Sequence, residues 1–135
     1  MKLSCRLLTD CNNVNSWHYT NVVEFAEGDT ATVYIQLLDE SVHSADEGYV
    51  PPGRRYVPAS GATLSVIMQS LDITRNITRF ATQPFPLDGS IWSFNVLPTD
   101  GVRGTIDLIL ILTEGTKITR GTLKAAIAVA AQVQS

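Results

Sequence analysis

The sequence of 135 residues carries little charge of either sign: 10 Lys and Arg stand against 13 Asp and Glu, for a formal net charge of −3. Proteins that bind nucleic acid through bulk electrostatics have an excess of positive charge, so we expect no nucleic-acid partner. Hydrophobic residues make up 44% of the chain. That is enough apolar surface to offset the entropy of the chain on folding, which excludes a disordered protein.

No hydrophobic run approaches the roughly 20 residues that a membrane-spanning helix needs, and the first residues lack the apolar core of a secretory signal. We therefore expect a soluble single domain, made in a cytoplasm, with no membrane partner. The only cysteines are Cys5 and Cys11. We expect both to be reduced thiols, because a cytoplasm keeps thiols reduced. A domain of this size also buries enough surface to be stable without a crosslink.

Residues arranged for catalysis are also lacking. The two histidines, His18 and His43, are the only side chains that ordinarily titrate near neutral pH, and they lie in separate segments. No serine stands in a nucleophile-elbow motif, and the glycines show no phosphate-binding spacing. We expect no enzymatic activity and no cofactor.

Two groups of residues have the side chains of metal ligands but not the spacing. Cys5, Cys11 and His18 fit no zinc pattern, and Cys5 alternates in register with Leu3 and Leu7, as a buried strand residue does. The acidic group follows no calcium-loop spacing; it consists of Asp39, Glu40, Asp46 and Glu47. We favour buried or idle thiols and a solvated acidic loop, and we predict no metal site.

Alternation of apolar and polar residues is the strongest pattern that is present. β-branched residues are frequent, as is typical of strands, and an apolar side chain at every second position indicates a strand with one buried face. The segments with this pattern are residues 2–7, 30–38, 62–71, 90–97 and 105–113. Trp92 shares its register with Phe94 and Val96, so we expect Trp92 to be a core residue.

Short turn motifs separate the predicted strands. Asp88-Gly89 and Asp100-Gly101 are typical of tight connections in which a residue adopts a positive φ. Glu114-Gly115 divides residues 104–113 from residues 116–133, and we interpret this pair as a long hairpin.

The last predicted strands differ in how clearly they can be assigned. Residues 105–113 have apolar side chains on both faces, so we expect a central strand that is covered on both sides. Residues 123–133 fit either a helix or a strand. Continuity with the hairpin favours a strand at least to Val129.

Many short strands with turns between them predict an all-β domain, an antiparallel β-sandwich over residues 1–135. Residues 1–21 would form an N-terminal strand and loop segment, and residues 22–133 the sandwich. One long loop is expected at residues 39–60, and loops of this length are commonly functional. Aromatic and charged residues are frequent at interfaces; the predicted protein-interface residues are Glu47, Tyr49, Arg54, Arg55 and Tyr56.

Several short runs carry a resemblance to a known class of proteins. They are YVPASGATL at 56–64, ATQPF at 81–85, DGSIW at 88–92, GT at 104–105 and LTEGTK at 112–117. Together they resemble small virion structural proteins of tailed bacteriophages, and the immunoglobulin-like N-terminal modules of phage baseplate adaptor proteins. The resemblance extends over residues 22–133.

The resemblance implies an immunoglobulin-like β-sandwich that docks in many copies onto the tail, baseplate or neck of a phage particle. The expected partners are other virion proteins and copies of the chain itself, and the expected location is the virion, assembled in the host cytoplasm. Two alternatives stay open. One is a capsid decoration protein that binds the major capsid protein, and the other is a carbohydrate-binding β-sandwich module.

Overall fold

The computed structural model describes residues 1–8, 19–20, 22–26, 28–41, 54–70, 75–97, 100 and 104–130. The strands are β1 (Leu3–Leu8), β2 (Tyr19–Thr20), β3 (Val23–Ala26), β4 (Ala31–Asp39), β5 (Arg54–Arg55), β6 (Thr63–Ser70), β7 (Arg75–Ala81), β8 (Ile91–Val96), β9 (Gly104–Glu114) and β10 (Lys117–Ala130). The prediction of an all-β domain is confirmed. Within these described ranges, no helix is long and apolar enough to cross a membrane.

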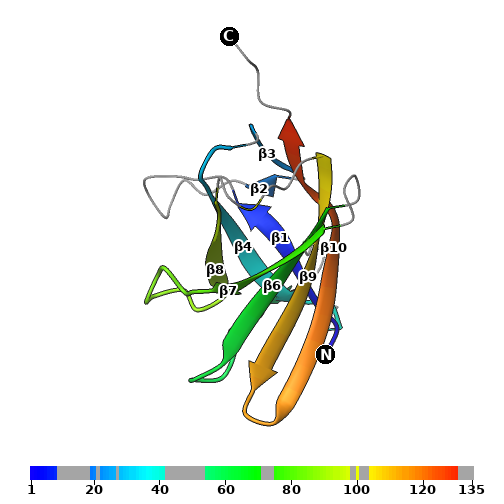
Figure 1. The fold of residues 1–135 in the computed structure, drawn as a ribbon. Coiled ribbons are helices and arrows are strands. Elements are labelled where there is room, and N and C mark those ends of the chain that lie inside the picture. Colours follow the sequence, from blue (N-terminus) through cyan, green and yellow to red (C-terminus); the bar gives the residue numbers. More distant parts are fainter. Residues whose placement is uncertain are drawn as a thin grey trace, which may run out of the picture.

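The strands form one continuous sheet that curls on itself until it nearly closes (Figure 1). The hydrogen-bonded order is β5-β4-β1-β10-β9-β6-β7, while β8 pairs with β4, β2 with β1, and β3 with β10. In Figure 1, β6, β9 and β10 pass in front of β1 and β4. The inner faces of these two halves enclose one common hydrophobic core.

Two pairings are parallel, so the sheet is mixed and the prediction of an antiparallel sheet needs correction. β1 meets β10 in parallel at Leu3 and Gly121, and β3 runs parallel to the end of β10, where Val23 lies beside Ile127. Beyond Gly121, β1 and β10 diverge. β2 pairs with the end of β1, and β3 pairs with the end of β10. The two short strands therefore lie in the gap that opens where β1 and β10 diverge.

The sheet closes between β7 and β8 through one backbone bridge and one ion pair. Thr82 and Ser93 exchange backbone hydrogen bonds of 2.9 and 2.8 Å. Beyond this bridge the Arg79 side chain spans the gap: Nε donates to the carbonyl oxygen of Asn95 at 3.3 Å, and the guanidinium pairs with the buried carboxylate of Asp100. The seam therefore depends on side chains as well as on strand pairing.

The inner face carries the alternating residues that the sequence predicts. Burial alternates residue by residue along β6, and Trp92, Phe94 and Val96 of β8 lie together in the core, which confirms Trp92 as a core residue. Cys5 of β1 is buried in the same core. Burial raises the pKa of its thiol to about 12, so the thiol is protonated and unreactive at neutral pH, as expected of a buried cysteine.

The turn motifs follow prediction in one case and depart from it in another. Gly115 has a φ of 63° and opens the two-residue connection between β9 and β10, which confirms the hairpin. Gly89, by contrast, does not have a positive φ. The turn is made by the Asp88 carboxylate, which accepts hydrogen bonds from the Ser90 N–H at 3.1 Å and the Ser90 hydroxyl at 2.6 Å. Gly101 lies outside the described residues.

A β-bulge interrupts β10 after Leu123. The buried carboxylate of Asp107, on β9, stabilises this bulge. One of its oxygens accepts a hydrogen bond from the Ala125 N–H at 2.8 Å, and the other accepts a hydrogen bond from Lys124 Nζ at 3.3 Å. Ala125 has a φ of 51°. A bulge bends its strand, so it turns the end of β10 away from β1 and toward β3. The strand continues to Ala130, which confirms the strand interpretation of this segment as far as the structure describes it.

Candidate protein interface

The residues predicted to form an interface do not lie together in one loop of the structure. Glu47 and Tyr49 lie outside the described residues. Arg54 and Arg55 form β5, which pairs with the end of β4. The prediction of a single loop over residues 39–60 is therefore wrong for its last part, because a strand lies within it and attaches it to the sheet. Arg55 remains exposed and accessible to a partner.

The acids at the start of this segment make contacts within the chain. One Asp39 oxygen accepts hydrogen bonds from the Ser41 hydroxyl at 2.6 Å, the Ser41 N–H at 3.0 Å and the Lys2 N–H at 3.2 Å. These bonds, with that of the Ser41 hydroxyl foremost, lower the pKa of Asp39. Glu40 pairs with Lys2 Nζ at 3.8 Å. In the described part of the chain, no group of three His, Cys, Asp or Glu side chains is placed to hold a metal ion.

Tyr56 connects the segment after β5 to the hairpin between β9 and β10. Its hydroxyl donates to the Glu114 carboxylate, with distances of 2.8 and 2.7 Å to the two oxygens. The Ala59 N–H donates to the same carboxylate at 3.0 Å, and the Tyr56 N–H donates to the Leu37 carbonyl at 2.9 Å. The half-buried ring packs against the core. Tyr56 therefore anchors its own chain, which is a different role from the interface contact that the sequence suggested.

Tyr56 and Glu114 shift each other's pKa. The hydrogen bond to Glu114, followed by burial, raises the pKa of Tyr56 to about 12. The Ala59 N–H, followed by the Tyr56 hydroxyl, lowers the pKa of Glu114. A carboxyl with a lowered pKa stabilises the fold above its unfolded pKa and loses that contribution as the pH falls. A phenol with a raised pKa stabilises the fold below its unfolded pKa and loses that contribution as the pH rises through the folded one.

We expect Tyr56→Phe to lower the free energy of unfolding by about 1 kcal/mol at neutral pH, because it removes the hydroxyl from this contact. The difference from the parent protein should shrink as the pH falls below about 4.5, where the glutamate of the unfolded chain begins to take up a proton, and on through the lower folded pKa of Glu114. It should shrink again as the pH rises above about 10, where the tyrosine of the unfolded chain ionises, toward the folded pKa of Tyr56 of about 12. Urea denaturation in acid, neutral and alkaline buffer measures both trends. A difference that stays constant with pH would contradict the coupling.

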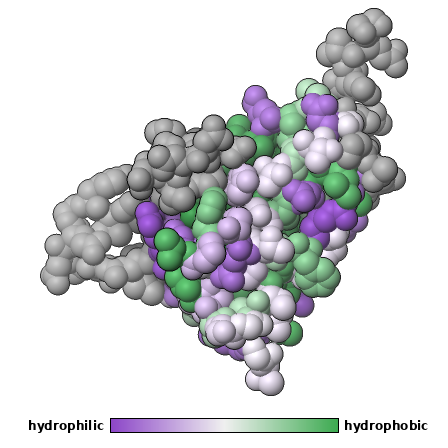
Figure 2. Space-filling view, turned by 90° about the vertical axis from the view of Figure 1, so that its left-hand side faces the viewer, coloured by the Kyte–Doolittle hydropathy of each residue, from purple (hydrophilic) through white to green (hydrophobic). Residues whose placement is uncertain are grey.

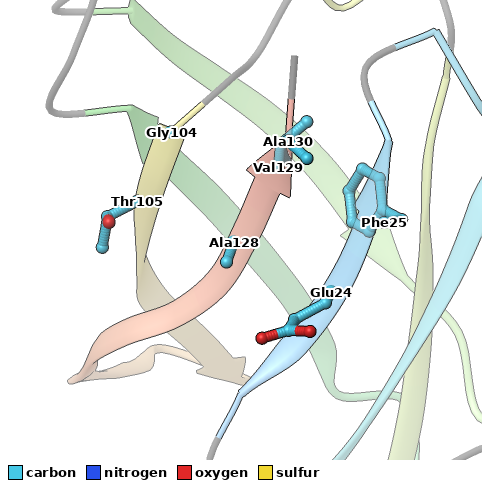
Figure 3. A pocket seen from close by; sticks show the side chains of 7 residues that line it. All are labelled: Glu24, Phe25, Gly104, Thr105, Ala128, Val129 and Ala130. Atoms are coloured by element: carbon cyan, nitrogen blue, oxygen red, sulfur yellow. The ribbon is translucent and has the colours of Figure 1, made fainter. Parts of the chain in front are cut away.

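A shallow hollow of about 510 Å³ lies over β3, β10 and the start of β9 (Figure 3). Its lining comes from Glu24, Phe25, Gly104, Thr105 and residues 128–130. Glu24 and Thr105 flank β10 in one row and are the only polar side chains among the described residues of the lining. One carboxylate and one hydroxyl fall short of the several convergent polar groups that orient a small ligand.

A more extensive surface lies on the outside of β7, β6, β9 and β10. The pairing registers align its side chains in rows across the four strands. The first row is Phe80, Ser65, Ile111 and Arg120; the second is Thr78, Ile67, Ile109 and Thr122; and Thr63, Thr113 and Ile118 extend the surface toward the hairpin. We call these eleven residues the outer face. They include five large apolar side chains and only one charge.

The sequence revealed only part of this surface. Residues 105–113 do form a central strand, as predicted, and the inner side chains of β9 are fully buried. Ile109 and Ile111 point outward and are only half-buried. The prediction that this strand is covered on both faces is therefore wrong. Phe80 is 74% exposed and Ile118 is 60% exposed. Phe80 shares a row with Ile111, and Ile118 shares a row with Thr113; both placements follow from strand register, which no local pattern contains.

The side of the molecule around β8 is different in character. There hydrophobic residues are interspersed with hydrophilic ones (Figure 2). Isolated exposed apolar residues are normal on soluble proteins, so the ordered rows of the outer face are the more informative feature.

Comparison of the chain with protein-family models, with curated proteins and with solved structures finds no match. No family therefore supplies a substrate, cofactor or partner, which leaves surface geometry as the guide to function.

Proposed function

We propose that the chain is a non-enzymatic structural protein of a bacteriophage virion, and that it docks in many copies onto the tail, baseplate or neck. The observation that carries this proposal is the outer face, which presents Phe80, Ile118 and a central strip of isoleucines on a rigid sheet. Large contiguous apolar patches are rare on monomeric proteins and mark sites of protein contact. The short runs that resemble small phage virion proteins agree with such a role.

The edge of β7 that faces β8 offers a second kind of contact beyond the Thr82–Ser93 bridge, where the Arg79 side chain spans it in place of a paired strand. β7 ends the hydrogen-bonded order. The backbone N–H and C=O groups of Thr82 point toward Ser93. In an antiparallel strand these groups point to the same side at every second residue, so those of Asn76, Thr78 and Phe80 point to this side as well. On that side, away from β6, no strand in the described part of the chain pairs with these three residues. An unpaired edge is a template for a strand from another chain, so a sheet edge and a sheet face together suit a protein that is held by several neighbours.

The location of the protein in intact particles tests this proposal. An antibody against the purified chain is used to probe gradient-purified particles from lysed cells that express the gene, by immunoblot and by immunogold electron microscopy. We expect the protein to copurify with the particles and the label to lie on the tail, baseplate or neck. Label over the capsid surface would favour the decoration alternative. Absence of the protein from purified particles would overturn the virion role.

A further inference from the structure

We propose that two copies of this chain bind each other through their outer faces, about a two-fold axis that runs parallel to the strands between β6 and β9. This inference rests on the proposed role as an assembly protein. It names the surface and the partner of one contact, and it can be tested on the purified protein alone.

Charge is confined to one side of this surface. Arg120, on β10, is exposed and no acid stands in its row. Lys124, farther along β10, is paired with the buried Asp107 at 3.3 Å. On the opposite side, β7 presents the exposed Phe80 and Thr78 without a charge. A partner that places its own apolar side over Arg120 avoids contact between like charges.

A second copy turned by half a revolution meets this requirement. With the axis parallel to the strands, β7 of one copy lies over β10 of the other, and β6 lies over β9. Phe80 then faces Arg120 of the second copy, where a guanidinium over an aromatic ring is favourable. Ile67 faces Ile109 of the second copy at the centre. The two-fold symmetry makes each of these contacts twice.

The other two-fold arrangement is less favourable. An axis perpendicular to the strands would place each strand over its own copy, and β10 would then lie over β10. Arg120 would approach Arg120 of the second copy, and like charges in a desolvated contact are strongly unfavourable. Charge placement therefore selects the axis parallel to the strands. This also agrees with the nearly aligned packing that stacked sheets prefer.

The size of the surface predicts a weak dimer. Four strands at a spacing of about 4.8 Å span about 19 Å, and an eight-residue strand such as β6 extends about 26 Å. The contact therefore covers on the order of 500 Å² on each copy, or about 1,000 Å² in total, near the lower limit for specific interfaces. We expect an equilibrium that depends on concentration and is reinforced where many copies are held together.

Sedimentation velocity from low micromolar to near-millimolar protein measures this equilibrium. Ile111→Lys places a charge in the contact at an outward-facing, half-buried side chain, and a circular dichroism spectrum checks that this variant is folded. Phe80→Ala removes a ring that is 74% exposed, so it leaves the core intact. We expect each to raise the dissociation constant at least about tenfold, which corresponds to about 1.4 kcal/mol. Val57→Lys is the matched control, because Val57 is 61% exposed and lies outside the outer face; it should leave the equilibrium unchanged.

Crosslinking tests the orientation of the two copies. In a Cys11→Ser background, with Cys5 buried and unreactive, Thr78→Cys protein is mixed with Thr122→Cys protein, because these exposed positions lie on the two outer strands of the surface and face each other across the proposed axis. A bismaleimide with a span near the roughly 10 Å between stacked sheets should join the mixture faster than either variant alone.

The results separate this inference from the proposed function. A protein that stays monomeric at all concentrations overturns the inference, as does a dimer that resists both outer-face variants or shows no preference in crosslinking. Incorporation of a strictly monomeric protein into particles would leave the virion role intact. A dimer with the expected mutational profile that is absent from particles would instead overturn the virion role.

Discussion

Trp92→Ala will lower the free energy of unfolding by about 3–5 kcal/mol, the range found for truncation of large core side chains. Trp92 is 3% exposed and shares the core with Phe94 and Val96, so the substitution leaves a cavity between the two halves of the sheet. Urea denaturation followed by circular dichroism should show a large fall in the transition midpoint with little change in slope. An unchanged midpoint would show that the indole does not support the core.

Trp92→Phe is the matched control. The indole Nε1 is buried and has no hydrogen-bond partner among the described residues, so phenylalanine removes a donor without breaking a bond. We expect this substitution to cost about 1.5 kcal/mol or less, as conservative changes of core shape do. If Trp92→Phe proves as costly as Trp92→Ala, the indole N–H itself contributes to stability.

Gly121→Ala will destabilise the fold by roughly 3 kcal/mol, at the upper end of the usual cost of overpacking. A Cβ at this position would lie 2.3 Å from the Leu3 carbonyl oxygen and 2.9 Å from the Leu3 carbonyl carbon. Both are backbone atoms, so no rotamer change relieves the clash, and β1 must move away from β10. Denaturation gives the loss in free energy. Hydrogen exchange of the β1 amides should show that protection is lost there first.

Gly61→Ala separates this clash from the general cost of replacing a glycine. Gly61 has a φ of 84° and open space around its Cβ position, so its replacement should cost only the backbone strain of about 1–2 kcal/mol. Gly121 does not have a positive φ, so its loss is steric alone. If the two substitutions cost the same, the close contact of β1 and β10 does not matter to stability.

The local pattern of the sequence was sufficient to predict β1, β4, β6, β8, β9 and β10, but not β7 or the short strands β2, β3 and β5. Alternation identified the buried face of β1, β4, β6, β8 and β9, and Trp92 and Cys5 lie in the core where their registers place them. The hairpin at Gly115 and the strand character of β10 follow from the same reasoning. These features depend on residues within about ten positions of one another, which is the range over which periodicity is informative.

What the sequence did not predict depends on residues far apart in the chain. The parallel contact of Leu3 with Gly121, the bond between Tyr56 and Glu114, and the pair of Arg79 with Asp100 leave no periodic signal. The same holds for the outer face. A strand register decides which side chains share a row, and registers between distant strands are settled by packing. The candidate site was therefore placed on a segment whose last residues belong to the sheet.

The contact of β1 with β10 has a consequence for how each copy is made. β1 leaves the ribosome first and β10 last, yet the two are neighbours in the finished sheet. Pairings between distant parts of a chain slow folding, because the loop must close before the contact forms. The Leu3 end of the β1 edge that meets β10 stays without its partner until β10 has been made, and during this interval nascent chains can exchange strands. The chain is thus most prone to aggregation before β10 has been made.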